Sequence, residues 1–136
     1  MDLLEDDAQL TSDAIWNALP IKTKLIHDIW SGHVVFVHLD PIMRLPAENL
    51  LTYLPKVGDV FYYYRPPHYL RGSPYGKVED AELGFVYARD SRPQGPRGAK
   101  AVNVFGSIQS SDLESFETMS ERILYEGTKN IEIVRA

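Results

Sequence analysis

The hydrophobic pattern in the first part of the chain changes from helical to strand-like near Pro20. Ile15, Trp16 and Leu19 recur at the spacing of one helix face. The side-chain oxygens of residues 11–13, Thr-Ser-Asp, are suited to cap a first turn, and Pro20 cannot continue a helix. The sequence therefore predicts a short helix that begins after residue 13 and ends before Pro20.

Six later segments have the alternation, or the β-branched and aromatic content, that is typical of strands. Ser31-Gly32 separates the first two and predicts a hairpin turn, in which the glycine supplies a positive φ. In Tyr62-Tyr63-Tyr64, alternation sends the middle ring to one face and the outer two to the other. The predicted strands cover residues 22–30, 34–39, 60–64, 82–87, 101–108 and 131–134.

A second helix is predicted near the end of the chain. Ser111 and Glu114 match a capping box, and Gly127 is placed as a C-terminal cap. The apolar stripe between them consists of Leu113, Phe116, Ile123 and Leu124. With the six strands, these two helices predict a mainly β fold, a β-barrel with two helices, that spans residues 1–136 as a single domain.

Three segments rich in proline or glycine separate the strands, at residues 40–56, 65–78 and 89–100. Loops longer than about 12 residues are usually functional or disordered. Residues 65–100 hold seven basic and four acidic side chains, although the chain as a whole is acidic. If the second and third loops lie at the same end of the barrel, they form a basic rim that attracts a small anion. Ordinary surface charge is the alternative interpretation.

Composition mainly excludes classes of protein. The 136 residues are 44% hydrophobic and 24% charged, which is ordinary for one globular domain. The net charge of −5 argues against a nucleic acid partner. The absence of cysteine excludes disulfides, thiol nucleophiles and Cys-ligated metals. The chain has no apolar run of membrane-spanning length and no leader pattern, so we expect a cytoplasmic protein without a membrane partner.

The first thirteen residues are acidic and contain no basic side chain, so we expect a solvated and frayed start. The acidic residues in this segment are Asp2, Glu5, Asp6, Asp7 and Asp13.

Glu82 is the carboxylate of greatest interest, because it opens an apolar strand where a buried charge needs a partner or a raised pKa. Arg65, Arg89 and Asn103 are the candidate partners. Both a structural salt bridge and a general base are consistent with this position. Asn103 lies in the middle of another strand and, if buried, needs hydrogen bonds from a loop or a ligand.

The histidines do not form a recognisable metal motif. His27, His33, His38 and His68 include no His-x-His pair and no His-Glu-x-x-His pattern. We therefore expect no dedicated metal site and no cofactor.

A series of short motifs runs along nearly the whole chain: Leu3–Ala8, Ala14–Pro20, His27 with Trp30–Gly32, Glu48–Asn49, Gly58–Asp59, Glu82–Tyr87, Asn103–Gly106 and Leu124–Gly127. Their order and spacing resemble a bacterial family of unknown function with a cyclophilin-like fold. The resemblance implies a closed β-barrel with a helix at each end and a pocket without a settled reaction. The pocket residues that it implies are His27, Trp30, Glu48, Asn49, Glu82, Tyr87 and Asn103.

Two positions depart from that family. His33 stands where members tend to have an acid after Trp-Ser-Gly. Members also usually have a strand before the segment that corresponds to Leu3-Leu4-Glu5. Either the barrel has an exposed edge that a partner subunit pairs, giving a homodimer or higher oligomer, or the recorded start lies too far downstream.

The first functional hypothesis is a small-molecule-binding protein. A barrel-end pocket lined by Trp30, Tyr87 and Asn103 would hold a small polar or anionic molecule. Glu82 and Glu48 would orient it, and Asn49 and Arg65 are further candidate ligand-binding residues.

The alternative is a hydrolase or isomerase acting on an amide or related carbonyl compound. Glu82 or His27 would be the general acid or base, and Asn103 would donate to the developing oxyanion. Peptidyl-prolyl isomerisation is a second alternative. Isomerases of the resembled fold use an arginine beside a hydrophobic proline pocket, and that motif has no match here.

Overall fold

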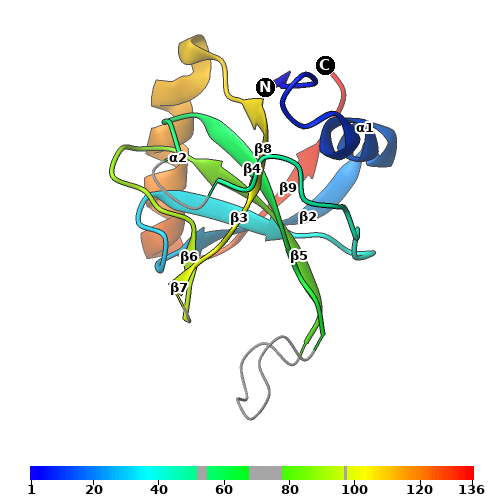
Figure 1. Ribbon diagram of the computed structural model, residues 1–136. Helices are drawn as coiled ribbons and strands as arrows, with labels where there is room; N and C mark the ends of the chain where they lie inside the picture. The colour runs from blue at the N-terminus through cyan, green and yellow to red at the C-terminus, as the bar shows by residue number, and fades with distance from the viewer. Residues whose placement is uncertain (52–54, 68–77, 97) are drawn as a thin grey trace.

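The structure is a computed structural model that describes residues 1–51, 55–67, 78–96 and 98–136 (Figure 1). In chain order the elements are β1 (Asp2–Leu3), α1 (Gln9–Ala18), β2 (Ile21–Asp28), β3 (Val34–His38), β4 (Asp59–Arg65), β5 (Asp80–Val86), β6 (Gln94–Gly95), β7 (Gly98–Ala99), β8 (Asn103–Ser107), a 3-10 turn (Ser110–Asp112), α2 (Leu113–Glu126) and β9 (Lys129–Ile133). The described residues are therefore mainly β with two α-helices, as the hydrophobic pattern predicts. No helix among them is long and apolar enough to cross a membrane.

Seven of the strands form one antiparallel sheet in the order β1-β8-β4-β5-β3-β2-β9. The sheet curls into a half-barrel (Figure 1). Within the described residues β1 and β9 are its two edges, and no ladder joins them. The closed barrel that the resemblance implies is thus not formed by these strands. β1 pairs only two residues with β8, and an apolar groove of about 590 Å³ lies where Leu3 and Ile133 approach α1 and α2.

Side-chain alternation gives the sheet two apolar faces. The helix-covered face carries Val35, Leu83 and Phe105, which pack with Ile15 of α1 and Ile123 of α2. The opposite face, called the outer face, carries a smaller buried cluster of Val34, Phe61, Val86, Val102 and Val104.

The tyrosine run of β4 follows the predicted alternation. Tyr62 and Tyr64 pack on the helix-covered face, whereas Tyr63 packs on the outer face. The buried Tyr62 hydroxyl donates to the carbonyl of Met43 at 2.6 Å and accepts from the amide of Leu45 at 3.0 Å. The connection after β3 is therefore tied to the sheet, although it has no regular strand of its own.

The predicted start of α1 was wrong. The helix begins at Gln9, so Thr11 and Ser12 lie inside it and are fully buried instead of forming its cap. Its first turn is capped from a distance, because the Glu48 carboxylate accepts hydrogen bonds from the amides of Leu10 and Thr11. The cap therefore comes from a loop residue that the local sequence does not contain.

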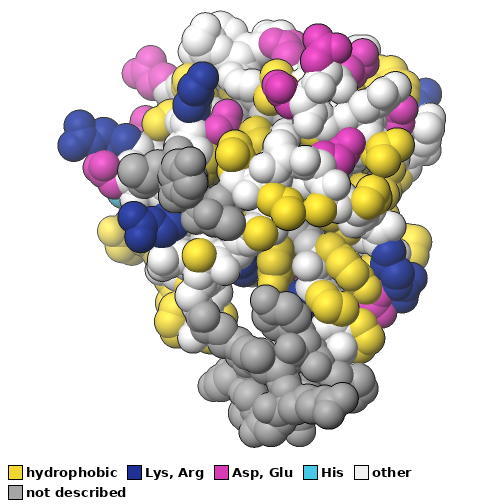
Figure 2. Space-filling view, in the orientation of Figure 1, with side chains coloured by type: hydrophobic (Ala, Val, Ile, Leu, Met, Phe, Trp, Pro, Cys, Tyr) yellow, Lys and Arg dark blue, Asp and Glu magenta, His cyan; other side chains and the backbone are white. Residues whose placement is uncertain are grey.

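The prediction of a frayed N-terminus was also wrong. Asp2 and Leu3 pair with Ser107 and Gly106 of β8. The amide of Leu4 then donates to the carbonyl of Phe105 at 2.8 Å. Backbone pairing thus ties the acidic start to the sheet, and Figure 2 shows acidic side chains gathered at the end of the molecule where this segment lies.

Of the turn and cap predictions, those for Gly32 and Gly127 are confirmed and the one for Ser111 is wrong. Gly32 has φ +86° between β2 and β3, as predicted. Gly127 has φ +88° and donates its amide to the carbonyl of Ile123, which confirms it as the C-cap of α2. The capping box at Ser111 was wrong, because α2 follows a 3-10 turn and no side chain caps its first residue.

Candidate functional site

A half-open cavity of about 680 Å³ lies between the outer face of the sheet and the short β6–β7 hairpin. We call it the hairpin cavity. Its aromatic walls come from Trp30, Phe36, Tyr63 and Tyr64, and Glu82 reaches it from β5. Arg65 and Lys100 are its cationic residues. Such a concave, mostly apolar site with a few charged groups is the usual form of a small-molecule pocket.

Ser31 anchors the hairpin over the sheet. Its hydroxyl lies 2.7 Å from Asp28 Oδ2 and 3.1 Å from the carbonyl of Gln94, and it accepts the Gln94 amide at 2.9 Å. The carbonyl of Ser31 accepts the amide of Arg92 at 2.9 Å. The tight turn predicted between β2 and β3 therefore also positions one wall of the cavity.

Lys100 is the ion-pair partner of Glu82. The two side chains are 12% and 7% exposed, and Lys100 Nζ lies 2.8 Å from Glu82 Oε2. The Lys100 ammonium also lies 4.9 Å from the centre of the Tyr63 ring. A Cβ on Gly95 would lie 3.2 Å from Lys100 Cε, so the hairpin glycine leaves room for the lysine side chain.

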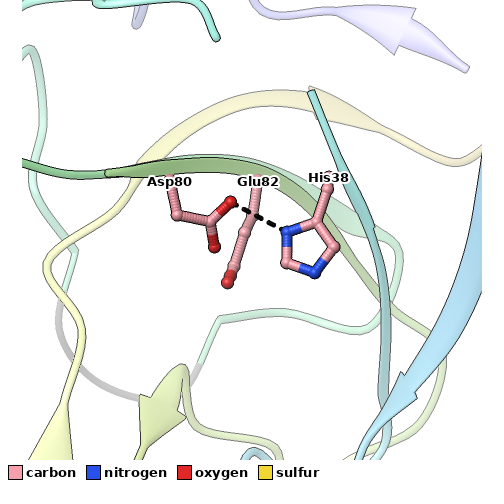
Figure 3. Close-up of side chains that lie close together, drawn as sticks. All are labelled: His38, Asp80 and Glu82. Carbon is pink, nitrogen blue, oxygen red and sulfur yellow. Dashed lines mark hydrogen bonds and ion pairs between the residues drawn. The ribbon is translucent and has the colours of Figure 1, made fainter. Parts of the chain in front are cut away.

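Strand register places further charged groups beside this pair. His38, Glu82 and Tyr63 are register partners across β3, β5 and β4, and Asp80 faces Arg65 in the next row. Because side chains repeat every second residue, Asp80 and Glu82 project from the same face of β5. Figure 3 shows both carboxylates beside the His38 ring.

Asp80 has its own cationic partners. Its Oδ1 lies 2.8 Å from His38 Nδ1, and its Oδ2 lies 3.8 Å from an Arg65 guanidinium nitrogen. The hydrogen bond to Asp80 raises the pKa of the half-exposed His38. Burial raises the pKa of Asp80, but the hydrogen bond from His38, together with the contact with Glu82 and the charge of Arg65, outweighs burial, so the net shift is downward.

The pKa of Glu82 is shifted in the opposite direction, upward. Burial raises the pKa of its carboxyl, and Asp80 adds to this, although Lys100 acts in the opposite direction. The two carboxyl groups of β5 therefore differ in acidity, with Asp80 the stronger acid. Divergent pKa values of this kind are common at functional sites and also occur in structural ion-pair networks.

The donor atoms of His38, Asp80 and Glu82 lie within 4.8 Å of one another, which is close enough for all three to contact one metal ion. Cations from the chain already hold these groups, because Lys100 pairs with Glu82 and Arg65 approaches Asp80. We therefore do not assign the three as metal ligands. The expectation of no metal stays a prediction.

The predicted basic rim is largely neutralised where the structure describes it. Arg65, Arg89 and Lys100 each have an acidic partner from the same segment, respectively Asp80, Asp90 and Glu82. Neighbouring strand and loop positions thus supply opposite charges in pairs. Arg92, the fourth described basic residue of the segment, has no acidic partner among the described residues, and Arg71, Lys77 and Arg97 lie outside them.

Glu48, Asn49 and Asn103 belong to a different part of the molecule, where the loop after β3 meets α1 and β8. Asn103 Oδ1 accepts the amide of Glu48 at 2.8 Å, and its Nδ2 donates to the Pro46 carbonyl at 2.9 Å and to Thr11 Oγ1 at 3.2 Å. Its amide hydrogens are therefore committed, and none remains for the expected oxyanion role.

Asn49 and Glu48 extend the same network. The Asn49 amide pairs with both backbone groups of Val104, at 2.8 Å and 2.9 Å, as a neighbouring strand would. Burial raises the pKa of Glu48, but hydrogen bonds from Thr11 and Leu10 outweigh it, so the net shift is downward. These contacts attach the loop to the helix and the sheet.

His27 and Tyr87 meet on the helix-covered side. His27 Nε2 lies 2.7 Å from the Tyr87 hydroxyl, and the His33 ring packs edge-on against Tyr87. Burial lowers the pKa of His27, and His33 adds to this while Asp28 opposes it. Tyr87 is 1% exposed. His68 lies outside the described residues.

The predicted site residues therefore fall into three groups rather than around one hollow. Trp30, Arg65 and Glu82 line the hairpin cavity, and His27 contributes to its lining as well as contacting Tyr87. Tyr87 packs in the helix-covered core. Asn103, Glu48 and Asn49 hold α1 and β8 together. The predicted pocket lining of Trp30, Tyr87 and Asn103 was thus wrong as a set.

Sequence reasoning missed Lys100, Asp80 and His38 as neighbours of Glu82. It considered Arg65, Arg89 and Asn103 as partners for that carboxylate instead. The glycines of the β6–β7 hairpin were the available signal, because a reversal at Gly95–Gly98 returns Lys100 toward the sheet. The alternation of β5 was a second signal, since it places Asp80 on the face of Glu82.

Comparison with known proteins gives a family but no activity. No curated protein matches the chain. The family model described as "Protein of unknown function (DUF3830)" matches residues 1–135. Because this match covers nearly the whole sequence, the chain belongs to that family of proteins of unknown function.

Proposed function

We propose that the protein binds a small polar or anionic molecule in the hairpin cavity. The observation that carries this proposal is one half-open cavity of about 680 Å³ that combines aromatic walls with the buried Lys100–Glu82 pair. Trp30, Phe36 and Tyr63 offer flat apolar contacts, whereas Lys100 and Arg65 offer donors to an acceptor group. Glu82 is the acceptor for a ligand hydrogen.

A fragment screen by NMR tests this proposal. Neutral, anionic and cationic fragments are added to the labelled protein, and the residues whose amide signals shift are mapped. We expect saturable shifts at the β6–β7 hairpin and along β4, with quenching of Trp30 fluorescence that is lost in Trp30→Phe. Shifts confined to the apolar groove beside Trp16, or no saturable binding to the hairpin cavity, would refute the proposal.

A hydrolase or isomerase acting on an amide or related carbonyl compound is the second candidate. The raised pKa of Glu82, beside the more acidic Asp80, favours it. Lys100 replaces Asn103 as the group that would stabilise negative charge on the substrate oxygen. Prolyl isomerisation stays a prediction, which an assay with a proline peptide tests. Four further statements also stay predictions: the cyclophilin-like relationship, a bacterial source, cytoplasmic localisation and a homo-oligomer paired through an edge strand.

The variant Glu82→Gln separates binding from catalysis. An enzyme would lose rate by orders of magnitude while still binding its substrate, whereas a binding protein would change affinity only. Glu132→Gln is the matched control, because Glu132 pairs with the exposed Lys22 and is not among the residues lining the cavity.

A further inference from the structure

The hairpin cavity contains the Lys100–Glu82 ion pair, and both of its charged groups are nearly removed from water. The exposed fractions of the Lys100 and Glu82 side chains are 12% and 7%, and their charged atoms lie 2.8 Å apart. A ligand that reaches them meets two charges that already neutralise each other. The charge of the ligand therefore decides whether the Lys100–Glu82 ion pair stays intact.

A carboxylate ligand would place a second anion against the single ammonium of Lys100. Two ionised carboxylates that share one buried cation repel each other, and one of them then gains a proton. Glu82 is the group able to accept it, because burial and its neighbour Asp80 already raise its pKa. Asp80 is held in the ionised state by His38 and Arg65.

We infer that the hairpin cavity binds a small aromatic carboxylate through Lys100, and that Glu82 takes up one proton when this ligand binds. The inference rests on the proposed function and names its ligand class. In the complex, the Lys100 ammonium pairs with the ligand instead of Glu82 Oε2, and the proton on Glu82 comes from solvent. The net charge of the occupied cavity then equals that of the empty one.

The aromatic part of this ligand class follows from the cavity walls. Phe36 of β3 and Tyr63 of β4 lie on the outer face on either side of β5, and Trp30 stands at the more exposed side with 55% of its surface accessible. A flat ring matches these surfaces by stacking and edge contacts. Benzoate and its neutral analogue benzamide are therefore a matched pair of probes.

Other titratable and charged groups face Glu82 and must be separated from it in the test. His38 approaches from β3, Tyr63 and Arg65 from β4, Asp80 from β5 itself, and Lys100 from the segment after β7. His38 is a competing source of a pH effect, because the hydrogen bond to Asp80 raises its pKa above the ordinary value. The variant His38→Gln removes that source.

Isothermal titration calorimetry with benzoate and benzamide tests the inference between about pH 6 and 8, where benzoate stays ionised. We expect benzoate affinity to fall by up to about tenfold per pH unit, with uptake of one proton measured from buffers of different ionisation enthalpy. Benzamide should bind without this dependence. His38→Gln should retain the benzoate effect, whereas Glu82→Gln should abolish it and strengthen binding at the upper pH.

Lys100→Met should lose benzoate binding and keep benzamide binding. If that variant does not fold, Lys100→Met combined with Glu82→Gln removes both charges together and should give the same ligand selectivity. Benzoate binding that is independent of pH, a pH effect that survives in Glu82→Gln, or no benzoate binding would each overturn the inference. The proposed function fails separately, when no fragment, charged or neutral, binds the hairpin cavity.

Discussion

The phenyl ring of Phe61 lies directly on Gly84, its register partner on β5. A Cβ added to Gly84 would overlap this ring at three of its carbon atoms. The ring therefore fills the space of a missing side chain on the outer face. It separates the apolar cluster around Val34 and Val86 from the charged row that contains Glu82.

Gly84→Ala is expected to destabilise the fold through this overlap. Forcing a methyl group against a packed ring typically costs about 1–3 kcal/mol of unfolding free energy. Chemical denaturation measures the loss, and Phe61→Leu provides the partner change for a double-mutant cycle. The two substitutions should cost less together than the sum of their separate effects. If the losses of unfolding free energy from the two substitutions simply add, then contact with the Phe61 ring is not what prevents a side chain at Gly84.

Lys100→Met is expected to destabilise the protein by about 3 kcal/mol at neutral pH, because it leaves the Glu82 carboxylate buried without its cation. Adding Glu82→Gln should recover part of the loss. A carboxyl group whose folded pKa is raised destabilises the fold above that pKa, so the loss should shrink as pH falls and Glu82 gains a proton. Urea denaturation at several pH values measures both effects.

Lys22→Met is the control for that experiment. Its ammonium lies 3.9 Å from Glu132 but is 79% exposed, so its removal should change stability by less than about 0.5 kcal/mol. Equal losses from Lys22 and Lys100 would contradict the role given to burial.

Glu48→Ala is expected to cost about 1–2 kcal/mol, because it leaves the amides of Leu10 and Thr11 without their carboxylate cap. Glu48→Gln should cost less, since an amide oxygen still accepts a hydrogen bond. The folded pKa of Glu48 is lowered, so its contribution is present above the unfolded value and is lost as pH falls through the folded one.

Acid denaturation of the Glu48 variants measures this dependence. The stability difference between wild type and Glu48→Gln should therefore narrow in acid, whereas Glu5→Gln, at an exposed acidic position before α1, should not show this narrowing. A difference between wild type and Glu48→Gln that is constant with pH would contradict the capping role.

The histidines should titrate in a defined order. The hydrogen bond that His38 donates to Asp80 raises the pKa of His38, and burial lowers that of His27, so the His38 imidazole should keep its proton to higher pH. NMR titration of the ring carbons measures both curves. Asp80→Asn should lower the pKa of His38 and leave that of His27 in place. The reverse order in the wild type would refute the assigned contacts.

The local sequence pattern predicted those features of the fold that depend on residues close together in the chain. The strand positions and the opposite orientation of Tyr63 relative to Tyr62 and Tyr64 follow from alternation, and the reversals at Gly32 and Gly127 follow from the freedom of glycine. The need of Asn103 for hydrogen bonds was also predictable from its position in a strand. The loop carbonyl of Pro46 and the amide of Glu48 supply them.

Long-range pairing determined the parts that the sequence did not reveal. Glu48 caps Thr11 from 37 residues away, so nothing near α1 in the sequence indicates where that helix begins. Lys100 reaches Glu82 across 18 residues through a hairpin whose strands are two residues each, too short to leave a hydrophobic pattern. The predicted pocket therefore combined residues from separate motifs because of their chemical type. The register of the sheet instead places these residues on two different faces.

The central place of β5 in the sheet restricts how its length can change. β3 pairs with it on one side and β4 on the other, so neither neighbour can absorb a shift as a free edge would. A one-residue insertion before Glu82 would turn this carboxylate into the helix-covered core and bring Leu83 out to the position of Gly84, against the Phe61 ring. Natural variation in chain length should consequently collect in the connecting segments, while this strand keeps a constant number of residues.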